Sequence, residues 1–203
     1  MYSIKFYASV VRALDEIGAP YMIVGAFAGI PFGITRATYD IDILVELREQ
    51  DFDALSAKFP LPRYYADPEM MRNSVQMGIM FNIIDSSEAI KADLVPLKRE
   101  PEYRVAFERR IRRQFSDGET KFEAWCARPE DIIVGKLQAW QEGRSAKHPA
   151  DIKSILLFVL DKDSEIAFDM NIVSLAALQI SQEALKMWDD LVAEAQREIR
   201  DQI

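Results

Sequence analysis

The sequence has very little cysteine or histidine. It holds one of each, Cys126 and His148. A single cysteine excludes an internal disulfide and a cysteine-based metal cluster, and a single histidine excludes a zinc site built from several histidines. We therefore treat both residues as bystanders and expect the reducing environment of the cytoplasm.

Long hydrophobic runs are also missing. No apolar stretch approaches the length of a membrane helix, and the first residues lack the apolar core and cleavage site of a signal peptide. The 203 residues are 49% hydrophobic and 29% charged, which is an ordinary globular composition. These features predict a cytoplasmic protein with no membrane partner.

Positive charge is scarcer than negative charge, and the formal net charge is −8. A surface of this sign disfavours broad, nonspecific binding to DNA. Arginines nevertheless gather in residues 104–113. This segment is either the solvated face of a helix or a local surface for tRNA or another acidic acceptor.

Two acidic residues stand out in the apolar segment 40–46. Its composition predicts a strand, on which Asp40 and Asp42 share one face while Ile41 and Ile43 point into the core. Two neighbouring carboxylates repel each other unless a cation lies between them, and hard divalent ions such as Mg²⁺ prefer oxygen ligands. The alternative is an amphipathic strand with a solvated acidic face.

A glycine follows the apolar run Tyr21-Met22-Ile23-Val24 upstream of the acids. Gly25 would let the backbone pass close to a ligand, and a helix after it would present free N–H groups to anions. Together with the acids, this predicts a phosphate-binding turn beside a metal site. A glycine after a strand is otherwise a simple turn.

The pattern Gly25-Ala26, thirteen residues, then Asp40-Ile41-Asp42 resembles the signature of the nucleotidyltransferase superfamily, with its polymerase-beta-like fold. The sequence from Arg36 to Asp42 is most similar to that of the small bacterial branch of AbiEii-like toxin nucleotidyltransferases. The resemblance covers roughly residues 21–156. It departs at Ala26, where the family has glycine or serine, and this weakens the expected phosphate contact.

The resemblance implies an α/β fold, a mixed sheet with flanking helices, and a C-terminal helical lobe that closes the cleft. It implies two Mg²⁺ ions, or Mn²⁺, held by three acids, with Asp93 as the third metal ligand or the base. Asp85 is the alternative third acid, although its place before Ser86 and Ser87 favours turn capping.

Further site residues follow from the same resemblance. Gly25, Ala26 and Lys136 would bind the nucleotide, and Asp151 would support the site, with Lys136 as its partner. Arg36 and Thr38 would either contact phosphate or orient the strand. An acid such as Asp151 can also simply stabilise the first turn of a helix.

Periodicity and turn residues predict the order of elements along the chain. Residues 63–74 carry no clean period and indicate a loop or short helix. We place the boundary between a catalytic lobe, residues 1–100, and a helical lobe, residues 101–203, near residue 100. We predict helices at 4–17, 26–32, 50–59, 102–114, 129–141, 149–160 and 181–200, and strands at 21–24, 40–46, 75–84 and 92–95, the last two antiparallel.

These patterns favour an enzyme that transfers a nucleoside monophosphate from a nucleoside triphosphate to a hydroxyl and releases pyrophosphate. The acceptor would be RNA, a protein side chain or a small molecule. The alternative is a nucleotide-binding or partner-binding module with the same fold, for instance one half of a toxin–antitoxin pair with a cognate antitoxin. Ala26 favours the alternative, whereas Asp40, Asp42 and Asp93 favour the enzyme.

Overall fold

A computed structural model describes residues 4–38, 40–97 and 103–201. The chain forms two compact units, and each is described by itself. Unit 1 comprises residues 1–27 and 37–126, and unit 2 comprises residues 28–36 and 127–203. Of the helices in the described ranges, none is both long and apolar enough to cross a membrane.

Unit 1 is built on a mixed sheet, which confirms the expected α/β class. Within the described residues the sheet has seven strands in the order β3-β4-β5-β2-β1-β7-β6. Strand β2 runs antiparallel to β1 and parallel to β5. The strands are β1 (Tyr21–Val24), β2 (Asp40–Val45), β3 (Tyr64–Tyr65), β4 (Phe81–Asp85), β5 (Ile90–Pro96), β6 (Ile111–Ser116) and β7 (Lys121–Cys126).

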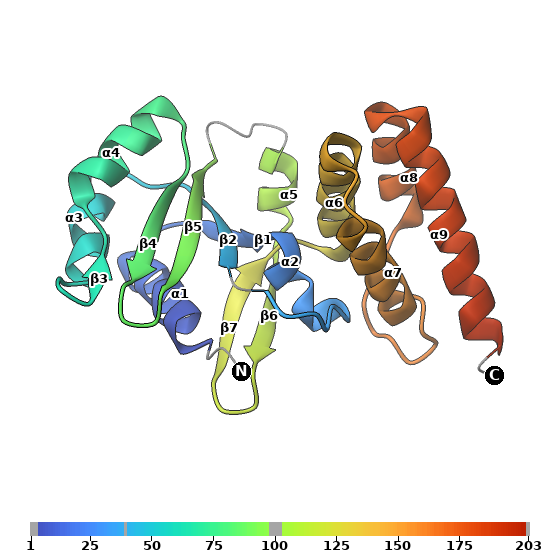
Figure 1. Cartoon of the computed structure of the whole chain (residues 1–203), viewed down its shortest axis with the longest axis horizontal. Helices are drawn as coiled ribbons and strands as arrows, with labels where there is room; N and C mark the ends of the chain where they lie inside the picture. Colours follow the sequence, from blue (N-terminus) through green and yellow to red (C-terminus); the bar gives the residue numbers. More distant parts are fainter. Residues whose placement is uncertain (1–3, 39, 98–102, 202–203) are drawn as a thin grey trace. The chain divides into compact units, whose positions relative to one another are not determined.

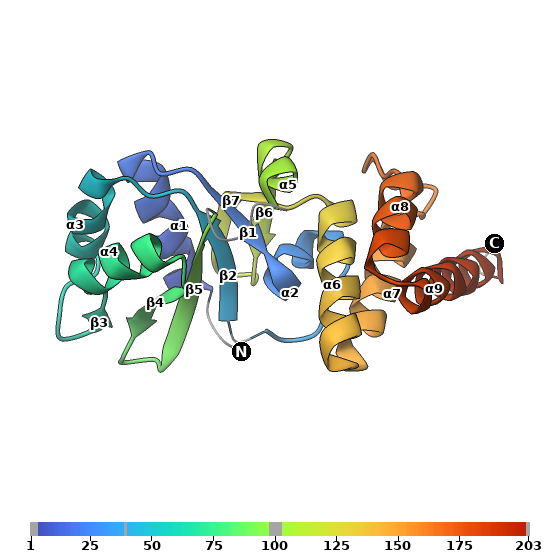
Figure 2. The same cartoon turned by 90° about the horizontal axis from the view of Figure 1, so that it is seen from above.

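The helices of unit 1 cover the sheet with their apolar faces. Helix α1 is amphipathic, buries Val10 and Leu14, and ends at Gly18, which adopts a left-handed conformation. Helices α1, α3 and α4 lie next to one another (Figures 1 and 2). The helices of this unit are α1 (Lys5–Ile17), α2 (Gly25–Ala28, whose last residue belongs to unit 2), α3 (Glu49–Ala57), α4 (Pro68–Met77) and α5 (Arg104–Glu108).

The acidic strand β2 alternates as the sequence predicts. Ile41 and Ile43 are fully buried, Asp40 is exposed and Asp42 is partly exposed. The two carboxylates therefore lie on the opposite face of the strand from its isoleucines.

One helix and one strand boundary differ from the sequence prediction. Helix α4 occupies residues 68–77, where a loop or short helix and then the start of a strand were expected, and β4 begins only at Phe81. Asp67 caps this helix by accepting a hydrogen bond from the Met70 N–H, and Gly78 ends it with a left-handed conformation. The antiparallel pairing of β4 with β5 is confirmed.

The prediction of a helix over residues 102–114 is wrong. Its described part contains only the short α5, followed by β6, which pairs with the unpredicted strand β7. Strand β6 is hydrogen-bonded to β7, and β7 pairs with β1. These pairings outweigh the helix-forming tendency of the arginine-rich segment. Strands therefore continue well past residue 101.

Unit 2 is helical apart from the segment that it takes from residues 28–36. Its helices pack around Ile133 of α6, Leu156 of α7 and Trp188 of α9, all of them buried. Helices α6 to α9 lie side by side (Figures 1 and 2). Helix α8 was not predicted. The elements are the 3₁₀ turn η1 (Ile30–Phe32), α6 (Pro129–Gly143), α7 (Lys147–Val159), α8 (Met170–Ile180) and α9 (Gln182–Asp201).

The division into units differs from the predicted boundary near residue 100. Residues 98–102, on which that boundary falls, lie outside the described residues. The change of unit comes between Cys126 and Ala127, because the β6–β7 hairpin completes the sheet of unit 1.

Candidate active site

Three predicted site acids come together on one face of the sheet in unit 1. In the parallel pairing of β2 with β5, Asp42 lies opposite Asp93, and Asp40 lies opposite Lys91. Paired residues of neighbouring strands point to the same face, as do residues at i and i+2. Asp40, Asp42, Asp93 and Lys91 therefore form one group of charged side chains, here called the acidic face.

Lys91 is the residue of this group to which sequence reasoning gave no role. Its Nζ lies 2.8 Å from Oδ1 and 2.7 Å from Oδ2 of Asp93. The amide of Asn82, opposite Asp93 on β4, donates a second hydrogen bond to Oδ1. The signal was present in the sequence, since Lys91 stands two positions before Asp93 on a strand. What the sequence lacked was the register that brings Asn82 beside them.

Local structure holds the two acids of β2 in place. Gly25 has a φ of 68°, and a Cβ at this position would overlap Oδ2 of Asp42. Only glycine allows both this positive φ and this close approach of Asp42 without strain. The hydroxyl of Thr38 lies 3.0 Å from Oδ1 of Asp40, so in this structure Thr38 contacts the acid.

The phosphate-binding turn expected at Gly25 and Ala26 is short. Helix α2 spans only Gly25–Ala28, so it presents less than two turns of aligned N–H groups. Phosphate binding at Gly25 and Ala26 stays a prediction.

Two groups at the acidic face, Lys91 and Tyr7, have raised pKa values. The hydrogen bond to Asp93 raises the pKa of Lys91; partial burial opposes this, and the charges of Asp93, Asp40 and Asp42 reinforce it. Burial, helped by the charges of Asp40 and Asp93, raises the pKa of Tyr7 to about 12. Lys91 is therefore an ammonium and Tyr7 a neutral phenol at neutral pH.

The donor chemistry of the acidic face suits a hard divalent ion, but its three acids are not arranged to bind one ion together. Among the described residues, no group of three or more acidic, histidine or cysteine side chains is placed to hold a metal ion. Both oxygens of Asp93 contact Lys91 instead. Asp40 and Asp42 are carboxylates, the donor type that such an ion prefers, whereas both oxygens of Asp93 are already in contact with Lys91.

A second charged cluster lies within unit 2 and consists of Arg36, Lys136 and Asp151. Arg36 binds the carboxylate of Asp151 through Nε at 2.7 Å and Nη2 at 2.8 Å. Lys136 donates to Oδ2 of the same carboxylate at 2.6 Å. The structure thus pairs Lys136 with Asp151, and it gives Arg36 the same partner, which sequence reasoning did not foresee. We call these three residues the cationic cluster.

The two cations of this cluster differ in accessibility. The side chain of Lys136 is 6% exposed, whereas that of Arg36 is 39% exposed. Burial lowers the pKa of Lys136 despite its hydrogen bond to Asp151. Burial also acts to raise the pKa of Asp151, but the hydrogen bonds and charges of Arg36 and Lys136 outweigh it and leave that pKa lowered. Arg36 is the cation that a ligand from solvent reaches more readily.

His148, treated as a bystander, lies close enough to this cluster for the charges of the cluster to affect its pKa. Burial lowers the pKa of His148, and the charges of Lys136 and Lys147 lower it further. Its buried Nδ1 has no hydrogen-bond partner among the described residues. The imidazole is therefore neutral at neutral pH.

Asp85, the alternative third acid, belongs to a turn. Its Oδ1 accepts hydrogen bonds from the N–H of Ser87 at 2.9 Å and from the N–H of Glu88 at 3.3 Å. Its Oδ2 accepts hydrogen bonds from Arg63. The turn-capping interpretation of Asp85 is confirmed.

The arginines of residues 104–113 do not form a helical face. Arg110 lies over the rings of Phe107 and Trp125, and Arg112, on β6, lies over Trp125 as well. Arg112 also lies near Asp15 and Glu123, at the longer distances of 3.7 and 3.8 Å. These stacking contacts account for two of the arginines without an RNA ligand.

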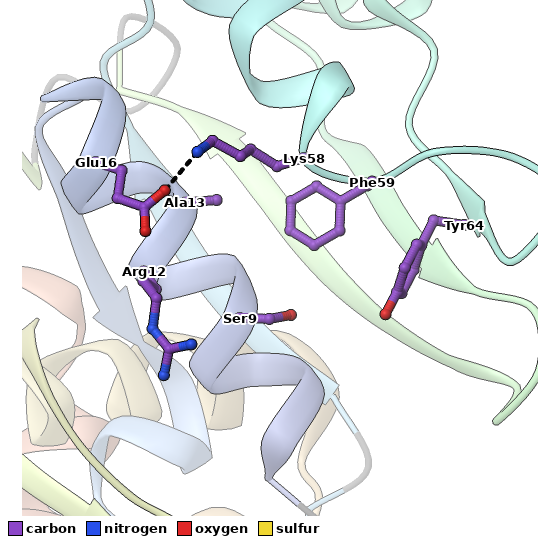
Figure 3. A pocket seen from close by; sticks show the side chains of 7 residues that line it. All are labelled: Ser9, Arg12, Ala13, Glu16, Lys58, Phe59 and Tyr64. Atoms are coloured by element: carbon purple, nitrogen blue, oxygen red, sulfur yellow. Dashed lines mark hydrogen bonds and ion pairs between the residues drawn. The ribbon is translucent and has the colours of Figure 1, made fainter.

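A hollow elsewhere in unit 1 is not part of either cluster. Figure 3 shows Lys58 reaching across it to Glu16, with their charged atoms 2.5 Å apart. None of the predicted site residues lines it. Its lining residues are Ser9, Arg12, Ala13, Glu16, Lys58, Phe59 and Tyr64.

The fold and the acidic face define a mixed α/β protein with carboxylates gathered on one side of its sheet. No protein-family model matches the sequence, and no curated protein matches it.

Solved structures do match the chain. An antigenic nucleotidyltransferase-like protein from Paracoccidioides brasiliensis is 16% identical, with a TM-score of 0.49 over 91% of this chain and 92% of that one. JHP933 from Helicobacter pylori is 15% identical, with a TM-score of 0.48 over 98% and 92%. ANT(2")-Ia, solved in complex with adenylyl-2"-tobramycin, is 14% identical, with a TM-score of 0.42 over 96% and 97%. Such identities and TM-scores do not carry a function from one protein to another.

Proposed function

We propose that the protein transfers a nucleoside monophosphate from a nucleoside triphosphate to a hydroxyl acceptor and releases pyrophosphate. One observation carries the proposal: Asp40, Asp42 and Asp93 occupy one face of two adjacent strands, in register across β2 and β5. Repulsion among three neighbouring carboxylates is costly unless cations neutralise it. Such a group of carboxylates is therefore suited to binding cations.

Asp40 and Asp42 would hold a divalent ion, Mg²⁺ or Mn²⁺. Such an ion neutralises phosphate charge and lowers the pKa of an attacking hydroxyl. Two local features accommodate these carboxylates. Gly25 has no Cβ and so leaves space for the Asp42 carboxylate, and the Thr38 hydroxyl contacts Asp40. The hydrogen bond from Thr38 restricts the Asp40 carboxylate before any ligand binds, and such preorganisation lowers the cost of binding.

The cationic cluster of unit 2 contains an arginine and a lysine, the side chains that bind phosphate oxygens. Two cations of this cluster bind the same carboxylate, that of Asp151. We propose that Arg36 and Lys136 contact nucleotide phosphates and that Asp151 positions both. Arg36, being more exposed, offers the first contact.

The finer parts of the proposal rest on the resemblance of the sequence to the AbiEii-like branch. That resemblance is the ground for proposing a component of a toxin–antitoxin pair, and RNA is the acceptor that we propose to test first. A protein side chain or a small molecule with a hydroxyl would suit the same chemistry.

Incubation with each labelled nucleoside triphosphate, Mg²⁺ and total cellular RNA tests the proposal. We expect label on the RNA, with release of pyrophosphate, and loss of both in Asp40→Asn. Asp85→Asn serves as the matched control, because this acid also lies on the sheet but caps a turn. Nucleotide binding without any labelled product or pyrophosphate would contradict the enzyme and favour a binding module.

A further inference from the structure

Asp93 has its hydrogen-bonding capacity largely filled by the chain itself. Its two oxygens contact the Lys91 ammonium at 2.7 and 2.8 Å, and the Asn82 amide donates to Oδ1. Asp93 is 5% exposed, so solvent does not reach it freely. A metal ion could take Asp93 as a ligand only by displacing a bound ammonium from a buried carboxylate.

Asp40 and Asp42 have different surroundings. Asp40 is exposed and Asp42 partly exposed, at the start of β2. The acidic face therefore has an accessible pair of acids and a buried third acid with its own cation.

The two accessible carboxylates supply oxygen ligands for one divalent ion. A second ion would need Asp93 as a further ligand, and Asp93 becomes available only if the Lys91 ammonium is displaced.

We infer that Lys91 is a built-in cation of the acidic face: Asp93 holds its ammonium, and the face takes one divalent ion, on Asp40 and Asp42, instead of the two that the sequence resemblance implies. Asp93 is then a positioning residue for Lys91 and not a metal ligand. This inference rests on the proposed metal site at Asp40 and Asp42.

Counting bound Mn²⁺ tests the inference without relying on catalysis. Purified full-length protein is titrated with Mn²⁺ in the absence of nucleotide, and free Mn²⁺ is measured by electron paramagnetic resonance. We expect one Mn²⁺ per wild-type chain and none bound by the double variant Asp40→Asn/Asp42→Asn.

The decisive comparison uses the double variant Lys91→Met/Asp93→Asn. It removes the ammonium and the carboxylate together, so the net charge of the face is unchanged and a difference in affinity reports a lost ligand. We expect one Mn²⁺ with an affinity within about threefold of wild type. The matched control is Arg63→Met/Asp85→Asn, which removes an ion pair outside the face.

Three results would overturn the inference. Two Mn²⁺ ions on the wild type, a measurement that needs no variant to fold, would show that Lys91 does not replace an ion. A tenfold or greater loss of affinity in Lys91→Met/Asp93→Asn, with the control unchanged, would make Asp93 a ligand. Both results leave the proposed transfer reaction standing. No Mn²⁺ on the wild type would instead remove the proposed metal site together with this inference.

Discussion

The acidic face of unit 1 and the cationic cluster of unit 2 are built on opposite charge patterns. In the acidic face, three carboxylates share one ammonium, that of Lys91. In the cationic cluster, a guanidinium and an ammonium share one carboxylate, that of Asp151. The first group therefore holds more acidic than basic side chains, and the second holds more basic than acidic ones.

The difference indicates what each group is suited to bind. Surplus carboxylate charge suits a divalent cation, and surplus arginine and lysine charge suits a phosphate. Each group also has one counter-ion, Lys91 in the first and Asp151 in the second. Removing a counter-ion should affect stability, because it leaves a buried charge unpaired, whereas removing one of the like-charged groups should affect ligand binding. The predictions below test this distinction, from the largest expected effect to the smallest.

Asp42→Asn should abolish transfer without loss of the fold. A metal ligand supports transition-state stabilisation of several kcal/mol, so its removal should lower the rate by about a thousandfold or more. The melting temperature should stay the same or rise, because one repelling charge is gone. Rate and melting temperature are measured on the same preparation, and a variant with more than a tenth of wild-type activity would contradict the role of Asp42.

Asp151→Asn should give the largest loss of stability. It removes the counter-ion of a buried lysine, and breaking a buried pair on one side costs about 3 kcal/mol when one cation, here Arg36, keeps partial contact with water. Urea unfolding followed by circular dichroism measures this. A loss below about 1 kcal/mol would mean that Asp151 does not stabilise the cluster.

Lys136→Met should weaken triphosphate binding with little change in melting temperature. Asp151 keeps the bidentate contact with Arg36 in this variant, so no buried charge is left unpaired. One charged phosphate contact is worth about 1.5–3 kcal/mol, or roughly a tenfold to hundredfold loss in affinity. Calorimetric binding that equals wild type would show that Lys136 holds Asp151 and nothing else.

The cationic cluster should also affect how stability changes with pH, although this effect is smaller. The pKa of Asp151 is lowered in the folded protein, so between its folded and unfolded values the unfolded state binds more protons. The stabilisation is complete above the unfolded pKa of about 3.9 and is lost as the pH falls through the folded pKa. Urea midpoints measured from neutral to acid pH should fall less steeply for Asp151→Asn than for wild type; parallel curves would contradict the assignment.

Local patterns in the sequence predicted the parts of the site that lie close together in the chain. The alternation of Asp40, Ile41, Asp42 and Ile43 defined both faces of β2, and Gly25 marked the end of β1. The antiparallel pairing of β4 with β5 followed from the short connection between them.

Long-range register was not predictable in the same way. Arg36 and Asp151 are 115 positions apart, and no local pattern joins them. The β6–β7 hairpin was missed because its arginines suit a helix as well as a strand, and pairing with β1 decides between the two. The role of Lys91 depends on which carboxylate its ammonium reaches, which the sequence alone does not fix.

One measurement tests the central claim, that the acidic face binds a metal and the protein binds a triphosphate with it. The melting temperature of the wild type is recorded with Mg²⁺ alone, with each nucleoside triphosphate alone, and with both together. We predict a rise of several degrees when both are present, a smaller rise with either alone, and no rise with both in Asp40→Asn/Asp42→Asn. A wild-type melting temperature that no combination changes would contradict the claim.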